Sequence, residues 1–238
     1  MENKPNLNSS KLSLNKTAIA AAIALFANII LAGAAYGGIL PGIISKGDGA
    51  AILSNIIVSE QQFRIAICLL ILNVIADIVV FWALYSFLKP VNKSISLLAA
   101  LFGAMHAVVA LAATNNLIDL LHMADRSISG FNSEIFYAQT ITAIDAFNWA
   151  WQAGMVMFSI HLLLRGWLLL KAGYLKKMLG IVMLIVAAGY LIDGFGRILI
   201  SGYNSSLVSV YVGWLEVVLP IWLLAKGRKI VSPLSIVD

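Results

Sequence analysis

Charged residues are scarce in this chain. Asp, Glu, Lys and Arg make up 11% of its 238 residues, and 61% of the residues are hydrophobic. A soluble domain has about a quarter of its residues charged, so this chain has too few charges to cover a surface that faces water. A chain surrounded by the hydrocarbon of a lipid bilayer does not need charged residues on its surface. The single cysteine, Cys68, excludes an intrachain disulfide and gives no information about the compartment.

Signatures of common catalytic chemistry are also absent. The sequence contains no H-E-x-x-H and no G-x-S-x-G, and its glycines do not form a phosphate-binding loop. The three histidines fall at three different depths of the predicted helices, so they cannot share one metal ion. We therefore expect no metal and no cofactor, with a carboxylate–histidine site built from Asp77, His106 and Glu216 as the one alternative left open.

The net charge of +5 does not indicate a nucleic-acid partner. The basic residues form short clusters at the ends of apolar runs, which is the pattern of cytoplasmic membrane flanks. Their expected partners are the anionic headgroups of membrane lipids.

The apolar runs predict an all-α, polytopic membrane bundle of six transmembrane helices. The predicted spans are residues 17–40, 63–88, 95–121, 138–164, 178–198 and 207–225, with a short apolar helix at 50–58 that lies at the interface. Residues 1–16 would form a polar cytoplasmic tail, 17–229 the transmembrane domain, and 230–238 a short C-terminal tail. A cleaved signal peptide is the competing interpretation of the first run, but residues 18–35 exceed the usual apolar region of about 7–15 residues.

Lysine and arginine sort cleanly between the two sides of the predicted spans. With both termini cytoplasmic, the outer side keeps only Lys46, Arg64, Arg126 and Arg197. The inner flanks then hold Lys4, Lys11, Lys16, Lys89, Lys93, Arg165, Lys171, Lys176, Lys177, Lys226, Arg228 and Lys229. This asymmetry sets the orientation by the positive-inside rule.

Three stretches resemble a known family. They are YSFLKPVNKSISLLAA at residues 85–100, HLLLRGWLLLKAGYLKKMLGIVMLIVAAGYLID at 161–193, and GWLEVVLPIWLLAKG at 213–227. Together they are similar to the bacterial integral-membrane family of domain of unknown function 4386, although Lys176 stands where a proline often follows Gly-Tyr-Leu in that family. The resemblance implies six helices and a bacterial plasma (inner) membrane, and it supplies no activity or catalytic residue.

Polar residues inside the predicted spans are the candidates for a functional site. A charge near the bilayer centre costs at least about 2.5–3.5 kcal/mol. Counted along each helix, the residues closest to the midplane are Asp77, His106 and Glu216, with Asn28, Asn73 and Gln152 near the same level. Such a group can carry a proton or bind a cation, or it can simply join helices through hydrogen bonds.

A second polar layer is predicted nearer the outside. It contains Asp119, Asp145, Asp193 and Arg197. Asp193 and Arg197 are four residues apart and are expected to pair on one helix face. The polar side of the bundle would then open outward as a vestibule that narrows towards the midplane residues.

Three functions fit these patterns. The first is transport or sensing of a small molecule or ion through the outward-facing cavity, and the second is a membrane enzyme that acts on a lipid or isoprenoid substrate. The third is a partner in membrane assembly without chemistry, which packs through faces such as Gly33-x-x-x-Gly37. Six helices are few to enclose a pathway, so a homodimer stays an option.

Overall fold

The fold is known from a computed structural model that describes residues 14–44, 48–128, 133–203 and 207–229. Every regular element in these ranges is helical, which confirms the predicted all-α class. Most of the predicted polar N-terminal tail lies outside the described residues, as do the whole predicted C-terminal tail and Lys46.

The helices follow the predicted apolar runs, with longer ends. Their bounds are α1 Leu14–Ala32, the π-helix η1 Gly33–Ile39, α2 Leu40–Ile43, α3 Gly49–Val58, α4 Glu60–Leu88, α5 Lys93–Ile128, α6 Ser133–Lys171, α7 Lys177–Leu199, α8 Leu207–Gly213, the 3-10 helix η2 Trp214–Val217, α9 Val218–Lys226 and the 3-10 helix η3 Gly227–Lys229. The short helix predicted at 50–58 is α3.

Among the residues that the structure describes, five helical stretches are long and apolar enough to cross a membrane. They are Leu14–Ile43, Glu60–Leu88, Lys93–Arg126, Glu134–Lys171 and Lys177–Leu199. The stretch predicted as a sixth span is divided into α8, η2 and α9, so no single α-helix of spanning length forms there. The chain is therefore a multi-pass membrane protein, with five long apolar helices in its described ranges.

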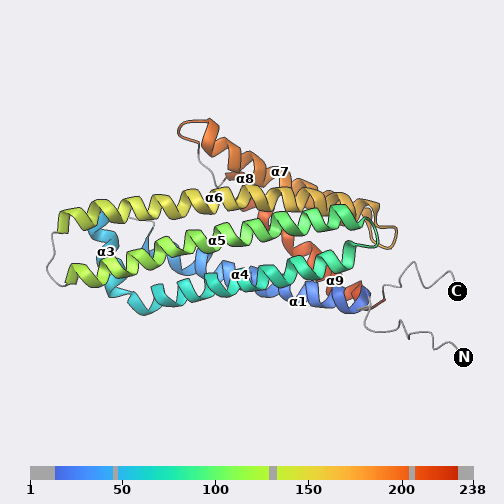
Figure 1. The fold of residues 1–238 in the computed structure, drawn as a ribbon, viewed down its shortest axis with the longest axis horizontal. Helices are drawn as coiled ribbons and strands as arrows, with labels where there is room; N and C mark the ends of the chain where they lie inside the picture. Colours follow the sequence, from blue (N-terminus) through green and yellow to red (C-terminus); the bar gives the residue numbers. More distant parts are fainter. Residues whose placement is uncertain (1–13, 45–47, 129–132, 204–206, 230–238) are drawn as a thin grey trace, which may run out of the picture.

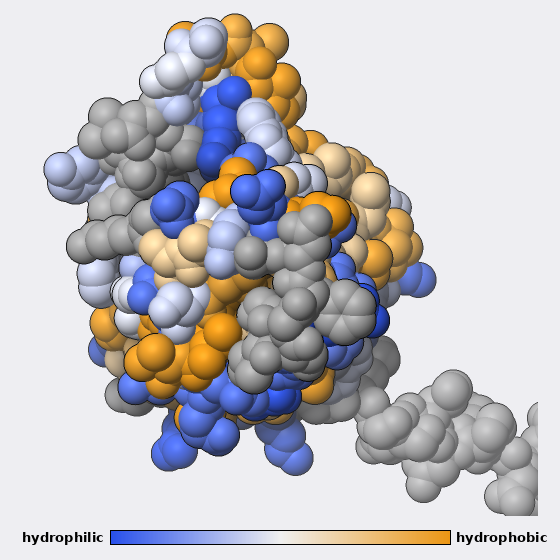
Figure 2. Space-filling view, turned by 90° about the vertical axis from the view of Figure 1, so that its left-hand side faces the viewer, coloured by the Kyte–Doolittle hydropathy of each residue, from blue (hydrophilic) through white to orange (hydrophobic). Residues whose placement is uncertain are grey.

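Two of these helices are longer than a bilayer requires. Helices α5 and α6 contain 36 and 39 residues, which at about 1.5 Å per residue exceeds the ~30 Å hydrocarbon layer. One end of the bundle carries Lys89, Lys93, Lys171 and Lys177 and is called the lysine-rich end; the other is the α3 end. Figure 2 looks onto the α3 end and shows hydrophilic side chains interspersed with hydrophobic ones on its face.

The sequence motifs at the lysine-rich end have a structural role. Asn92 caps α5, because its side-chain oxygen accepts a hydrogen bond from the backbone N–H of Ile95 at 3.0 Å. The Tyr174 hydroxyl, in the turn between α6 and α7, donates to the Phe87 carbonyl at 2.9 Å. Burial raises the pKa of Tyr174 to about 12, so this hydroxyl stays a donor at neutral pH.

The helices form a closed ring. Helices α1, α4, α5, α6 and α7 pack each against the next, and the C-terminal segment leaves α7 through α8 and η2 and packs with α9 and η3 against α1. Figure 1 shows this segment passing from α7 at the top of the view to α1 at the bottom. Ring closure turns one side of every helix towards a common interior.

The interior contains two apolar clusters. The cluster of the α3 end includes Phe63, Leu70, Leu117 and Phe147. The cluster of the lysine-rich half includes residues of α1, α4, α6, α7 and α9, among them Leu223. Asp77 lies on α4 between Val74 and Val80. His106 lies on α5 beside Ala107, and all three of these apolar residues belong to the cluster of the lysine-rich half.

Close helix packing occurs at glycines other than those predicted. A Cβ on Gly180 of α7 would lie 2.7 Å from the carbonyl oxygen of Gly166 on α6. Gly33 and Gly37, predicted as a packing face, are exposed within the π-helix, and a Cβ on either would meet nothing within 4 Å. Small residues that bring helices into contact are typical of membrane bundles.

Replacing Gly180 should loosen the packing between α6 and α7. We expect Gly180→Ala to lower the free energy of unfolding by about 1–3 kcal/mol, the usual cost of overpacking. Thermal unfolding of the purified protein in detergent measures the change. Gly173→Ala is the matched control, because its Cβ would meet nothing within 4 Å; equal stabilities of the two variants would contradict the prediction.

Candidate functional site

Asp77 is the centre of a buried polar cluster that joins three helices. Its side chain on α4 is 3% exposed. Its carboxylate accepts a hydrogen bond from the Asn28 amide on α1 at 2.7 Å, and a longer one from Asn73 at 3.4 Å. On the other side, the Nε2 atom of His106 on α5 lies 3.9 Å from the Asp77 Oδ2 atom. The structure therefore brings together Asp77, His106 and Asn73, as the sequence predicts.

The hydrogen-bond chemistry of His106 is determined by its other ring nitrogen. The Nδ1 atom lies 2.9 Å from the Gly154 carbonyl oxygen on α6. A carbonyl can only accept, so Nδ1 carries the hydrogen, and in a neutral ring Nε2 is an acceptor. An ionised Asp77 and a neutral His106 would then point two acceptors at each other in the buried interior. One additional proton, or a small cation in its place, turns this repulsion into attraction.

A second histidine repeats this arrangement. The His161 Nδ1 atom on α6 lies 2.7 Å from the Ala99 carbonyl on α5. Both pairs fall on one antiparallel register, since His106 follows Ala99 by seven residues and His161 follows Gly154 by seven. Each histidine thus bonds to the backbone of the other's helix. The ring of Phe158 lies between them, with centroids 4.9 Å from His106 and 5.8 Å from His161.

Glu216 belongs to a separate polar group. Its carboxylate, in η2, accepts a hydrogen bond from the Tyr190 hydroxyl on α7. It also interacts electrostatically with Arg165 and with Asp77. Glu216 is therefore close enough to Asp77 to interact with it electrostatically. Its carboxylate, however, already accepts the hydrogen bond from Tyr190.

Arg165 is the residue that sequence reasoning misplaced. It was assigned to a basic loop facing headgroups, yet it lies inside α6 and is 2% exposed. The assignment was wrong because the charge was taken as the end of an apolar run, whereas α6 continues to Lys171. A usable signal existed: Gly154, Phe158, His161 and Arg165 follow spacings of four, three and four, which place them on one helix face.

The residues of the predicted vestibule do not converge. Asp119 and Asp145 are exposed on α5 and α6. Asp193 is buried on α7 and accepts a hydrogen bond from the Tyr203 hydroxyl at 2.9 Å. The Arg197 guanidinium lies 5.2 Å from the centre of the Trp149 ring. Gln152 faces α7, where a Cβ on Gly194 would lie 3.6 Å from its amide nitrogen.

The interior between the polar centre and the α3 end is packed. Tyr36 of the π-helix stacks on Trp151 with ring centroids 5.0 Å apart, and both pack with Phe147. Phe147 belongs to the apolar cluster of the α3 end. Apolar residues therefore share the inner faces of these helices with the few polar ones, although Tyr36 itself is 40% exposed.

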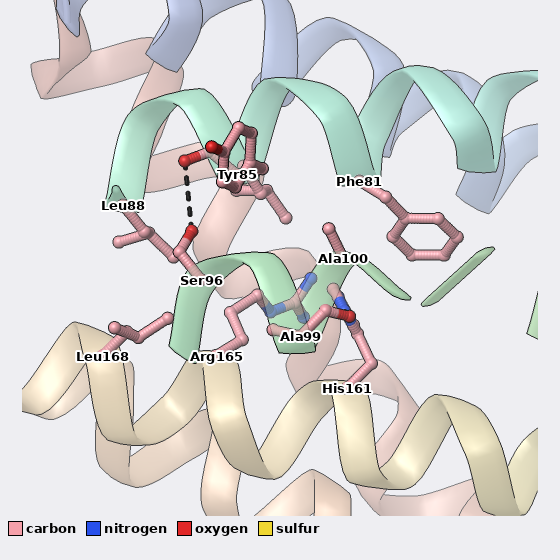
Figure 3. A pocket seen from close by; sticks show the side chains of 10 residues that line it. Phe81, Tyr85, Leu88, Ser96, Ala99, Ala100, His161, Arg165 and Leu168 are labelled. Carbon is pink, nitrogen blue, oxygen red and sulfur yellow. Dashed lines mark hydrogen bonds between the residues drawn. The ribbon is translucent and has the colours of Figure 1, made fainter. Parts of the chain in front are cut away.

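A cavity does occur in the lysine-rich half, between α4, α5 and α6. Figure 3 shows it, with His161 and Arg165 on α6 and Ser96 and Ala99 on α5. Within the described ranges, no three His, Cys, Asp or Glu side chains come together as a set of metal ligands.

These features define a multi-pass helical membrane protein with buried titratable side chains in its interior. The chain belongs to the family described as domain of unknown function DUF4386, which it matches over residues 20–227. It is 33% identical over 164 residues to an uncharacterised protein of the archaeon Archaeoglobus fulgidus, an alignment that covers 69% of this chain and 85% of the relative. No solved structure matches the chain.

Two substitutions of Asp77 should show whether the stability of the protein depends on the hydrogen bonds of this side chain or on its negative charge. Asp77→Asn keeps an acceptor for Asn28 and offers an amide donor to His106, so we expect little loss of stability. Asp77→Leu leaves both neighbours unpaired, and should lower the free energy of unfolding by about 1–3 kcal/mol. Unfolding in detergent measures both, with Asp119→Leu at an exposed position as the control. Equal destabilisation by Asn and Leu would show that the carboxylate charge itself is required.

Proposed function

We propose that this protein transports or senses a small molecule or ion, and that Asp77 and His106 together hold one exchangeable proton or a small monovalent cation. The 3.9 Å approach of two acceptor atoms supports this proposal. A structural hydrogen bond would join a donor to an acceptor at about 2.7–3.2 Å. The longer distance leaves the pair dependent on an additional positive charge.

Occupancy of this pair would change the packing of several helices. Asn28 on α1, Asp77 on α4, His106 on α5 and the Gly154 carbonyl on α6 form one continuous chain of contacts. Loss of the proton would leave Asp77 and His106 repelling each other, which favours separation of α4 from α5. Coupling between occupancy and helix position is what transport or sensing requires.

The depth of the centre favours an ion or proton over a large substrate. Asp77 lies 12 residues from Lys89, His106 lies 13 from Lys93 and Glu216 lies 10 from Lys226, which is roughly 15–20 Å of helix from the lysine-rich end. This is near the middle of a hydrocarbon layer of about 30 Å. The buried apolar cluster of the α3 end also supports an ion or proton over a lipid substrate.

We further propose six crossings, with both termini cytoplasmic in a bacterial inner membrane. Residues 207–229 are helical throughout, although in alternating α and 3-10 turns. Their length suffices for about 30 Å of hydrocarbon. The sorting of lysine and arginine supports an even number of crossings.

Proton movement in reconstituted vesicles tests the proposed function. Under an imposed membrane potential, wild-type protein should acidify vesicles that contain a pH-sensitive dye, and Asp77→Asn should reduce the rate at least about tenfold because the shared proton is lost. Infrared spectra of the same samples should lose a protonated-carboxyl band in Asp77→Asn.

Asp119→Asn, on the exposed face of α5, is the matched control and should behave as the wild type. The proposal fails if folded Asp77→Asn protein retains both the proton flux and the protonated-carboxyl band.

Reporter fusions test the number of crossings. A periplasm-active phosphatase fused after Asp238 should be inactive, and one fused after Tyr203 should be active, because the segment between them would cross the membrane once. Fluorescence of a cytoplasm-active reporter at the same two positions gives the complementary readout. Equal phosphatase activity at both positions would establish five crossings instead.

A further inference from the structure

The start of α1 and the helical turn η3 meet at the lysine-rich end of the bundle. Both η3 and α9 pack against α1, which closes the ring of helices. Gly227 is buried at this contact, and a Cβ added to it would lie 3.1 Å from the Cβ of Ala18. The backbone of η3 therefore lies close to α1, and the next residue, Arg228, stands beside the first turns of that helix.

An open groove of about 400 Å³ lies where these two segments meet. Its volume is within the range of small-molecule sites in proteins. The side chains that line it come from one stretch of α1 and from η3. They are Asn15, Lys16, Ile19, Ala20, Ile23 and Arg228.

The charge of the groove is positive and is not balanced by nearby carboxylates. Lys16 and Arg228 are both exposed. No Asp or Glu occurs in α1, α9 or η3, and in the part of the chain that the structure describes neither cation forms an ion pair. Two cations from opposite ends of the chain thus converge on one groove, which favours an anion as its occupant.

The rest of the groove is apolar and follows α1 towards the membrane. Ile19 and Ala20 are half-buried, and Ile23 is 60% exposed. From Lys16 to Ile23 the helix rises by about 10 Å. The groove therefore has a basic mouth at the level of the headgroups and an apolar strip that continues into the hydrocarbon layer.

We propose that this groove binds one phospholipid whose headgroup carries a net negative charge. Its phosphodiester pairs with Lys16 and with the planar guanidinium of Arg228, which can donate two parallel hydrogen bonds to phosphate oxygens. The upper part of one acyl chain covers Ile19, Ala20 and Ile23. A soluble anion would leave this apolar strip unused, and the ammonium group of a zwitterionic lipid would find no carboxylate there.

The bound lipid would join α1 to η3 and so stabilise the closed ring. General attraction between basic flanks and headgroups acts at every lysine of this end, whereas the groove adds one defined position. The site is separate from the Asp77–His106 pair and does not depend on the function proposed above.

Lipid binding to the full-length protein in detergent tests the proposal by native mass spectrometry and thermal unfolding. We expect one molecule of phosphatidylglycerol to bind at least about tenfold more tightly than phosphatidylcholine with the same acyl chains, and to raise the unfolding temperature. The preference should decrease at about 1 M salt, because both cations are exposed and their charges are screened. Inorganic phosphate, which has no acyl chain, should bind much more weakly.

Removing both cations should abolish the preference. Lys16→Gln combined with Arg228→Gln should weaken phosphatidylglycerol binding at least about tenfold and leave phosphatidylcholine binding unchanged. Lys93→Gln combined with Lys177→Gln is the matched control, because it removes the same charge from exposed positions of the same end that do not line the groove.

The apolar strip has its own test. Ile23→Ser should weaken phosphatidylglycerol binding about threefold or more by removing apolar contact, and Ile30→Ser, at a position of α1 that is 67% exposed and does not line the groove, should not. The proposal is overturned if phosphatidylglycerol binds no better than phosphatidylcholine, or if the two double variants bind it equally. It is also overturned if inorganic phosphate binds equally well, or if Lys16→Gln with Arg228→Gln abolishes a dimer and not lipid binding, since the groove would then hold a second copy of the chain.

Discussion

In hydrocarbon, a buried polar group must find its partner within the protein, and this constraint organises the interior of the bundle. The two histidines meet it in the same way: each donates Nδ1–H to a carbonyl of the facing helix, His106 to Gly154 and His161 to Ala99. These bonds fix the register of α5 against α6. The bond of His106 also turns its Nε2 atom towards Asp77.

Closure of the ring decides which polar residues meet. The C-terminal segment returns from α7 to α1, and its 3-10 turn places Glu216 against Tyr190. Residues that carry the family resemblance make several of the interhelical bonds. The Tyr174 hydroxyl donates to the end of α4, and the Tyr190 hydroxyl of α7 donates to Glu216 of η2. The family pattern is thus explained, in part, as the set of contacts that holds neighbouring helices together.

The sequence predicted part of the candidate site. Asp77 and His106 could be paired from depth alone, because charge in the membrane is costly and both lie about midway along apolar helices. The same argument from depth could not predict whether Asp119 and Asp145 face a common vestibule. Depth gives no rotation about a helix axis, and both side chains prove to lie on outer faces. The burial of Arg165 was not predicted, because a basic residue inside a helix interrupts the hydropathy pattern in the same way as the end of a helix does.

By itself the sequence determined that lipid surrounds the chain, that the fold is all-helical, where five of the apolar helices lie, and how deep in the membrane each polar residue is placed along its helix. These follow from composition and from the rise per residue, which act locally along the chain. Only the tertiary structure decided which side chains face one another. In the folded protein, Glu216 accepts a hydrogen bond from Tyr190, Arg165 is buried near His161, and apolar side chains fill the α3 half. Such contacts depend on the rotation and register of whole helices, which ring closure sets and no local pattern encodes.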